Sequence, residues 1–215
     1  FLMATPIMVA LAYFCGQNLS FVWRTHWRFA VLGLCIFSGN FTLFYYAGNS
    51  VASGLLAVVF STASLVNVLM SAAIARVWPP TSHLLASLVG IGGVILLFWT
   101  ELQMSNLALQ SLALCLLGTL FFCAGNMVSQ DSQRRGIPVF ASAAWGMFYG
   151  TFYLGGISLV MGHEFTMEPN IRYLGSLAWL TVMSTVLTFS CYLLLIGRIG
   201  ASRASYATVV FPVFA

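Results

Sequence analysis

Charged side chains are scarce in this chain. Only 6% of its 215 residues are Asp, Glu, Lys or Arg, while 60% are hydrophobic; an ordinary soluble domain has about 25% charged residues. The eight basic and four acidic residues are too few to keep the surface of a domain of this length in solution. The composition therefore excludes soluble enzymes, nucleic-acid-binding proteins and disordered chains, and it predicts an integral membrane protein.

Recognisable metal or disulfide patterns are also lacking. The five cysteines all lie within apolar runs, form no CxxC pair and have no histidine at ligand spacing, which favours small buried apolar residues. His163 and Glu164, followed by Glu168, lack the second histidine of a zinc-binding HExxH motif. We therefore expect no metal, no cofactor and no catalytic residue.

Long apolar runs are abundant, and no charge lies near the middle of any of them. About 20 apolar residues are needed to cross the hydrocarbon layer as a helix. The runs predict eight spanning helices, the last incomplete, at residues 1–17, 29–48, 51–75, 82–100, 107–129, 138–161, 173–196 and 201–215. Without a mid-membrane carboxylate or histidine, these helices carry no usual proton relay, which favours facilitated diffusion or exchange unless further helices supply the coupling.

The arginines are divided unevenly between the connections. If the predicted spans alternate in direction, one side of the membrane receives only Arg172, together with Glu101 and two other acids. The other side receives seven arginines: Arg24, Arg28, Arg76, Arg134, Arg135, Arg198 and Arg203. The positive-inside rule places that side in the cytoplasm. We expect a multi-pass protein of the cell membrane, such as a bacterial inner membrane, whose first helix runs from outside to inside.

The chain contains a weak internal repeat. At an offset of 148 residues, Asn40–Ser64 aligns without gaps with Thr188–Pro212, so that Phe41 meets Phe189 and Phe44 meets Tyr192. Five predicted helices separate the two copies, and a repeat with an odd number of helices inserts upside down. Inverted repeats are how many secondary transporters build two access states from one packing arrangement.

The second copy carries a family resemblance. The run Tyr192–Ala215 (YLLLIGRIGASRASYATVVFPVFA) has a small-residue turn that leads into a helix with a Pro-Val-hydrophobic-Ala step. It resembles the eighth and ninth helices of EamA-type members of the drug/metabolite transporter superfamily. Similar pieces occur at Val51–Leu65, where Ser64 replaces the usual proline, at Trp78–Leu97 and at Gly118–Arg135.

This resemblance implies an all-α polytopic helical bundle of two inverted EamA-like repeats, with ten helices in the family and about eight visible here. Residues 1–104 would form the first repeat, with helices two to five, and residues 105–215 the second, with helices six to nine. On that alignment the first and last helices are missing, so we expect the sequence to be a fragment.

Polar groups within the spans are the candidate substrate-binding residues, because polar groups in hydrocarbon must pair or line a cavity. Asn40 lies at mid-span on one face with Phe44, and Asn126 lies at a comparable depth. Asn67 belongs to a small polar stripe that ends at Ser71. A carboxamide both donates and accepts hydrogen bonds, which suits a solute headgroup, although a close helix–helix seam explains such a stripe equally well.

A second set of candidates is aromatic. Trp145 and Tyr149 form part of a stripe in 138–161, and Thr188 and Tyr192 occupy the positions that the repeat offset relates to Asn40 and Phe44. Buried indole and phenol groups want hydrogen-bond partners, so the stripe is either packed core or the wall of a cavity for amphipathic solutes.

The sequence as a whole predicts a secondary transporter that moves a small organic metabolite, such as an amino acid, by alternating access. The resemblance favours export. The expected partners are the small-molecule substrate and the lipid bilayer, with no nucleic acid, and the protein is expected to be a monomer or homodimer. An intramembrane enzyme and a non-transporting membrane scaffold are the alternatives.

Overall fold

The computed structural model describes residues 1–78, 106–162 and 170–211 and a few single positions between 81 and 96. Within these ranges every regular element is helical. Most of the span predicted at 82–100, Glu101 and the segment with His163, Glu164 and Glu168 lie outside the described residues. The prediction of an all-α membrane protein is confirmed.

Four helical stretches in the described part of the chain are long and apolar enough to cross a membrane. They are Trp23–Gly48, Ser53–Ala75, Leu109–Arg134 and Ile171–Ile199. Three of them extend beyond the predicted spans: the first begins at Trp23 rather than 29, the third continues to Arg134 rather than 129, and the fourth covers Ile171–Ile199 rather than 173–196. Arg28, which we expected in a connection, therefore lies on a helix, as do His26 and Asp131, which lie outside the predicted spans.

The chain divides into two compact units, each with residues from both expected repeats. The first unit comprises Phe1–Ser38 and Val128–Arg198, and the second comprises Gly39–Met127 and Ile199–Ala215. The first contains α1 (Ala4–Phe14), α2 (Trp23–Leu34), most of the π-helical segment η1 (Cys35–Gly39), the end of α7 (Asn106–Arg134), α8 (Val139–Val160), α9 (Ile171–Trp179), the π-helical segment η2 (Leu180–Leu187) and most of α10 (Thr188–Ile199). The second contains α3 (Asn40–Gly48), α4 (Ser53–Ser61), α5 (Ala63–Ala75), most of α7, α11 (Ala201–Ala204) and the 3-10 segment η3 (Ser205–Val210).

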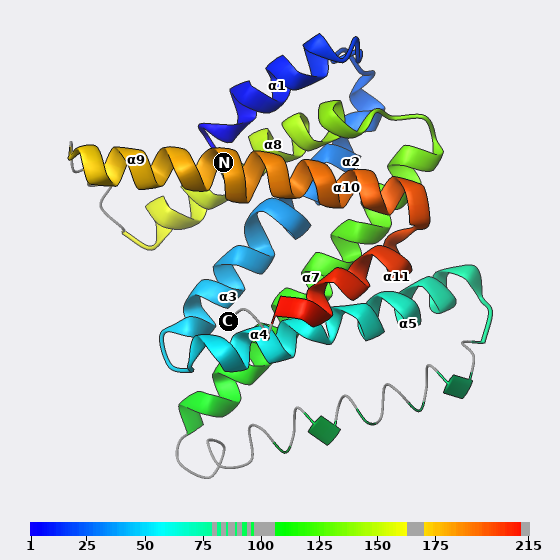
Figure 1. The fold of residues 1–215 in the computed structure, drawn as a ribbon, viewed down its shortest axis with the longest axis vertical. Helices are drawn as coiled ribbons and strands as arrows, with labels where there is room; N and C mark the ends of the chain where they lie inside the picture. Colours follow the sequence, from blue (N-terminus) through cyan, green and yellow to red (C-terminus); the bar gives the residue numbers. More distant parts are fainter. Residues whose placement is uncertain are drawn as a thin grey trace. The chain divides into compact units, whose positions relative to one another are not determined.

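In the first unit α8 packs against both α1 and α2 (Figure 1). Glycines allow the close approach of α2 and α8: a Cβ on Gly33 would lie 2.6 Å from the carbonyl oxygen of Gly146. A Cβ on Gly150 would lie 2.7 Å from the Cβ of Phe37. Small residues at such interfaces let membrane helices gain van der Waals contact where lipid removes the hydrophobic driving force.

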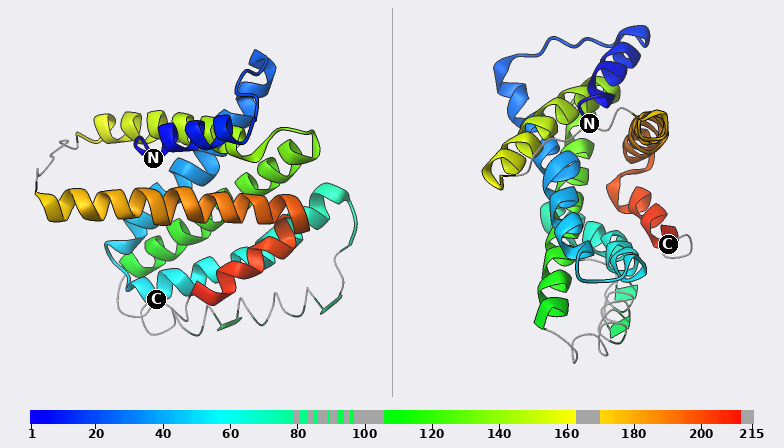
Figure 2. Two further views of the ribbon diagram at one scale, coloured as in Figure 1. Left: turned by 45° about the horizontal axis from the view of Figure 1, so that its top comes forward. Right: turned by 90° about the vertical axis from the view of Figure 1, so that its left-hand side faces the viewer.

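In the second unit α11 and η3 lie along α4 and α5 (Figure 2). The helix that contains α4 and α5 is interrupted at Thr62, although Ser64 stands where the family resemblance leads us to expect proline. Three hydroxyls explain the break, because Ser61, Thr62 and Ser64 donate to the carbonyl oxygens of Val58, Val59 and Ser61. Such bonds compete with the helical ladder and bend helices.

Element boundaries recur at the repeat interval. Helix α3 begins at Asn40 and α10 at Thr188, each directly after a π-helical segment, and these starts are 148 residues apart. Helix α4 begins at Ser53 and α11 at Ala201, which is the same interval. The register found in the sequence therefore coincides with matching helix starts at two places, of which the first is also a change from π-helix to α-helix.

Candidate functional site

An aromatic cluster in the first unit surrounds His26 of α2. The imidazole ring meets Trp145 of α8 edge-on, with ring centroids 4.6 Å apart, and it stacks on Trp23 at 5.9 Å. Phe29 stacks parallel to Trp145 from one turn further along α2, and it is 1% exposed. The Tyr149 hydroxyl lies 3.0 Å from His26 Nδ1. The two aromatic candidates of α8 are thus brought together around one titratable ring.

The connection between α1 and α2 fixes this cluster from a further side. Trp145 Nε1 donates to the carbonyl oxygen of Leu19 at 3.0 Å, and the amide of Ala141 donates to Gln17 Oε1 at 3.1 Å. The indole N–H therefore has the partner that a buried tryptophan requires. This geometry packs Trp145 into a wall of aromatic rings, in which Phe29 stacks on its indole.

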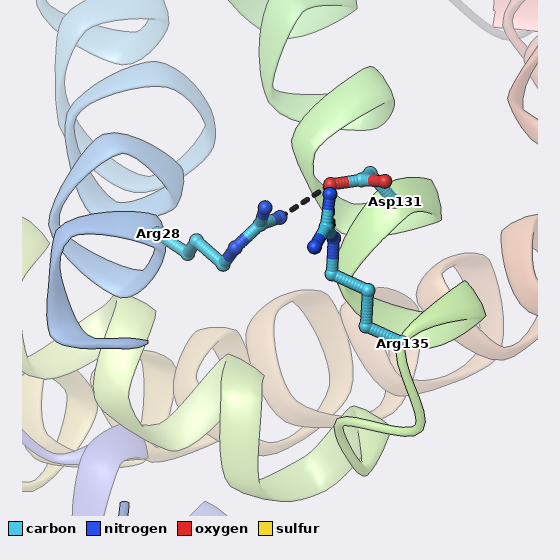
Figure 3. A network of polar contacts seen from close by, with 3 residues as sticks. All are labelled: Arg28, Asp131 and Arg135. Carbon is cyan, nitrogen blue, oxygen red and sulfur yellow. Dashed lines mark hydrogen bonds and ion pairs between the residues drawn. The ribbon is translucent and has the colours of Figure 1, made fainter. Parts of the chain in front are cut away.

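An ion-pair network lies on the same helix α2, just beyond His26. Arg28 Nη1 donates to Asp131 Oδ2 of α7 at 2.5 Å, and Arg135 Nε donates to the same oxygen at 3.0 Å (Figure 3). The Arg28 side chain is 13% exposed, whereas that of Arg135 is 61% exposed. Asp131 therefore neutralises one nearly buried guanidinium and one solvated guanidinium.

In the second unit, the predicted polar stripe of α5 contacts α11 and α7. Ser71 Oγ lies 2.7 Å from Ser202 Oγ of α11 and also donates to Met127 Sδ, and Ser202 Oγ donates to the carbonyl oxygen of Asn67. For Ser71 the helix–helix seam is thus the observed role. Asn67 is fully buried, and its amide nitrogen donates to Ala63 O at 2.9 Å, while Oδ1 has no partner among the described residues.

The candidates of α3 and α7 lie in the same unit. Asn40 is 4% exposed and its Oδ1 has no partner among the described residues, and Asn126 is fully buried in α7. Phe44 packs edge-on against Phe60, with ring centroids 5.2 Å apart. Its ring also covers Gly118, where an added Cβ would lie 2.8 Å away. A buried carboxamide oxygen without a partner costs free energy, so the buried Oδ1 atoms of Asn40 and Asn67 would each gain from a hydrogen-bond donor.

The two candidates of α10 are placed near the end of η2. Thr188 Oγ1 donates at 2.9 Å to the carbonyl oxygen of Met183, five residues back, and Thr185 makes the same kind of bond to Leu180. These hydroxyls satisfy carbonyl oxygens within the π-helical stretch. Tyr192 is half-buried one turn further along. The local role of Thr188 is therefore to pair with its own backbone.

The set of eight candidates is thus divided between the units: Trp145, Tyr149, Thr188 and Tyr192 belong to the first, and Asn40, Phe44, Asn67 and Asn126 to the second. Their assignment to a solute stays a prediction. Sequence reasoning missed His26, because it precedes the predicted span that begins at residue 29. Gly146 and Gly150 form a GxxxG motif, which could have predicted the close contact of α8 with another helix. No sequence pattern around Arg28 or Asp131 predicted that these two residues would pair.

The candidates of the first unit offer aromatic rings and hydroxyls, and those of the second offer buried carboxamides and an aromatic ring. No group of three or more metal-binding side chains occurs among the described residues.

Comparison with known proteins gives one match. Residues 110–215 match the EamA-like transporter family. No curated protein and no solved structure matches the chain.

Proposed function

Since residues 110–215 place this chain in the EamA-like transporter family, we propose that it is a secondary transporter that moves a small organic metabolite by alternating access. The family match is the observation that carries the proposal. The described helices agree with it, because four of them are long and apolar enough to make a multi-pass membrane protein.

The proposal includes two inverted repeats, residues 1–104 and 105–215. The coincident starts of α3 with α10 and of α4 with α11, both 148 residues apart, support this division. A transporter with inverted repeats exchanges the conformations of its two halves during the cycle. We assign the seven-arginine side to the cytoplasm by the positive-inside rule, and we take export across the cell membrane as the direction of transport.

The proposed solute is amphipathic, such as an amino acid with an apolar side chain. Asn40 and Asn67 each hold a buried carboxamide oxygen without a partner in the described residues, and such an acceptor suits an ammonium or hydroxyl donor of the solute. In the same unit, the ring of Phe44 would meet its apolar part and Asn126 would be a further contact. Within the first unit, we propose Trp145, Tyr149, Thr188 and Tyr192 as solute contacts.

Solute flux in proteoliposomes tests this function. The full-length protein is reconstituted, and uptake of a panel of labelled amino acids and related metabolites is compared for wild type, Asn40→Ala and Trp145→Ala. Ser71→Ala is the matched control, because its hydroxyl belongs to the helix seam. We expect flux of one solute class that falls at least about tenfold in Asn40→Ala, which is a loss of about 1.4 kcal/mol, and stays near wild type in the control.

Two results would argue against the proposal. Normal flux in folded Asn40→Ala and Trp145→Ala proteins would remove these residues from the pathway. Absence of flux for every solute would favour a membrane scaffold or an intramembrane enzyme. Because the matched family is one of transporters, we take the protein to be no enzyme.

A further inference from the structure

His26 is a titratable residue that the first unit holds by ring contacts and by a polar contact with Tyr149. It lies in the first turn of α2, in a stretch apolar enough to cross a membrane, yet it is partly exposed. Its neighbours Trp23 and Trp27 are 84% and 55% exposed. Tryptophans of this kind sit at the membrane–water interface, so the ring lies where protons from water can reach it.

The contacts of the ring suit both of its protonation states. A neutral imidazole either accepts or donates at Nδ1, whereas an imidazolium can only donate there. The Tyr149 hydroxyl lies 3.0 Å from Nδ1. It can donate to Nδ1 of a neutral ring, and it can accept from Nδ1–H of an imidazolium. The face of Trp23, on which the imidazole stacks at 5.9 Å, adds an electrostatic attraction for the charged ring.

The charged groups around His26 come from two helices. Arg24 and Arg28 flank His26 on α2, and the positive charge of each disfavours a positive charge on the imidazole. Arg28 is paired with Asp131 of α7, which also holds Arg135, so its charge is compensated at close range. Helix α8 faces the ring with Trp145 and Tyr149 and with no charged residue, and α1 carries none in its sequence.

From this arrangement we propose that His26 is a proton-binding residue that controls the hydrogen of the Tyr149 hydroxyl. When a proton binds, Nδ1–H donates to Tyr149 Oη, and the tyrosine hydrogen turns away from His26. That hydrogen is then free to donate to an acceptor group on a solute. When the ring is neutral and accepts at Nδ1, the hydroxyl hydrogen is held by the histidine.

The consequence for transport rests on the proposed function. If Tyr149 contacts the solute, proton binding at His26 strengthens that contact, and by linkage the solute strengthens proton binding equally. The carrier would therefore sense pH through an interfacial histidine although no carboxylate or histidine lies near the middle of its described spans. The proton-binding step itself needs no solute, and it can be tested alone.

Tryptophan fluorescence of the purified full-length protein measures that step. Imidazolium quenches a neighbouring indole more strongly than imidazole does, and histidines change charge between about pH 5 and pH 8. We expect the emission of wild type to fall as the pH is lowered through this range. His26→Gln should lose this fall, and His163→Gln, the matched control, should keep it. An equal response in His26→Gln and wild type, or none in wild type, would overturn the proposal.

Tyr149→Phe separates proton binding from its transmission. This variant keeps His26 and Trp145, so it should keep the fluorescence response. In proteoliposomes, using the solute that wild type carries, flux should rise on acidification in wild type and become independent of pH in Tyr149→Phe. Flux that keeps its pH dependence in Tyr149→Phe would refute the control of the hydroxyl.

The outcomes also separate this proposal from the function on which it rests. A fluorescence response that requires His26, in a protein that carries no solute, would uphold the proton site and contradict transport. Normal flux without any response that requires His26 would uphold transport and overturn the proton site.

Discussion

At the scale of single residues, Asp131 holds two arginines that differ in burial. The Arg28 side chain is 13% exposed and that of Arg135 is 61% exposed. A solvated ion pair contributes little, because water and salt screen it and ordering the side chains costs entropy. Loss of the partner of a nearly buried guanidinium costs more, since the charge keeps its desolvation penalty.

We therefore predict that Asp131→Ala lowers the free energy of unfolding by about 1 to 2 kcal/mol, whereas Arg135→Ala changes it by less than about 0.5 kcal/mol. Arg28→Met should cost less than Asp131→Ala, because it removes the buried charge together with its pair. Denaturant unfolding of the protein in detergent micelles measures all three. Equal effects of Asp131→Ala and Arg135→Ala would show that burial does not set the strength of this network.

Two glycines of α8 have opposite surroundings. A Cβ on Gly150 would lie 2.7 Å from Phe37 Cβ and 3.2 Å from its carbonyl oxygen, while nothing lies within 4 Å of a Cβ on Gly155. Gly150→Ala should destabilise the protein by about 1 to 3 kcal/mol through overpacking. Gly155→Ala should be neutral, or stabilising by up to about 1 kcal/mol, because alanine favours helix.

Thermal unfolding of the two glycine variants side by side checks this pair. Since both substitutions add the same methyl group to the same helix, the difference isolates the packing of Gly150 against Phe37 of η1 and the carbonyl oxygen of Gly33 in α2. A similar melting temperature for the two variants would contradict the close approach of α2 and α8.

At the scale of elements, the π-helical segments η1 and η2 are the irregular parts of otherwise long helices. In a π-helix the amide bonds to the carbonyl five residues back, and such stretches are rare in proteins and frequently occur at functional sites. Segment η2 keeps some of its carbonyl oxygens paired through Thr185 and Thr188. Each segment ends directly before a repeat-related helix start.

We predict that amides of Cys35–Gly39 and Leu180–Leu187 exchange hydrogen about tenfold faster than those in the middle of α8, because local opening is easier where the ladder is irregular. Hydrogen exchange followed by mass spectrometry in lipid nanodiscs measures the rates. Helix α8 is the internal control, since it is a continuous α-helix of 22 residues. Equal protection in all three segments would be the contrary result.

The elements also show how far a sequence determines them. Apolar runs located the spans, but the true ends of α2 and α7 depend on contacts across the unit: Arg28 and Asp131 satisfy each other and allow both helices to continue through charged residues. Likewise, the break at Thr62 comes from hydroxyl bonds to carbonyl oxygens, whereas we looked for proline. Periodicity detects burial, and it does not detect which polar groups will find partners.

At the scale of the whole molecule, orientation is the simplest consequence of the arginine distribution. The turn at Ser50 should face outside, and the repeat-related turn at Ile199 should face the cytoplasm. In a background without the five native cysteines, Ser50→Cys should react with a membrane-impermeant maleimide on intact cells. Ile199→Cys should react only after permeabilisation. Labelling of both positions from one side would contradict the inverted arrangement.

The family and the membrane class could be predicted from sequence, because both follow from composition and from a local pattern around Tyr192–Ala215. Less of the candidate site could be predicted from the sequence. Trp145 and Tyr149 were predicted as members of one stripe, but the ring that joins them belongs to His26, 123 residues before Tyr149. Contacts between residues so far apart in the chain depend on helix packing, which a single sequence does not contain.

Counterflow tests the transport of an organic metabolite by alternating access most directly. Proteoliposomes that contain the full-length protein are loaded with an unlabelled solute from the amino-acid panel and diluted into a trace of the same solute in labelled form. The account predicts a transient accumulation of label above that in unloaded proteoliposomes, because the unlabelled solute inside occupies most of the sites that return to the outside and so slows the exit of label. Label that enters no faster than into protein-free liposomes, for every solute of the panel, would contradict it.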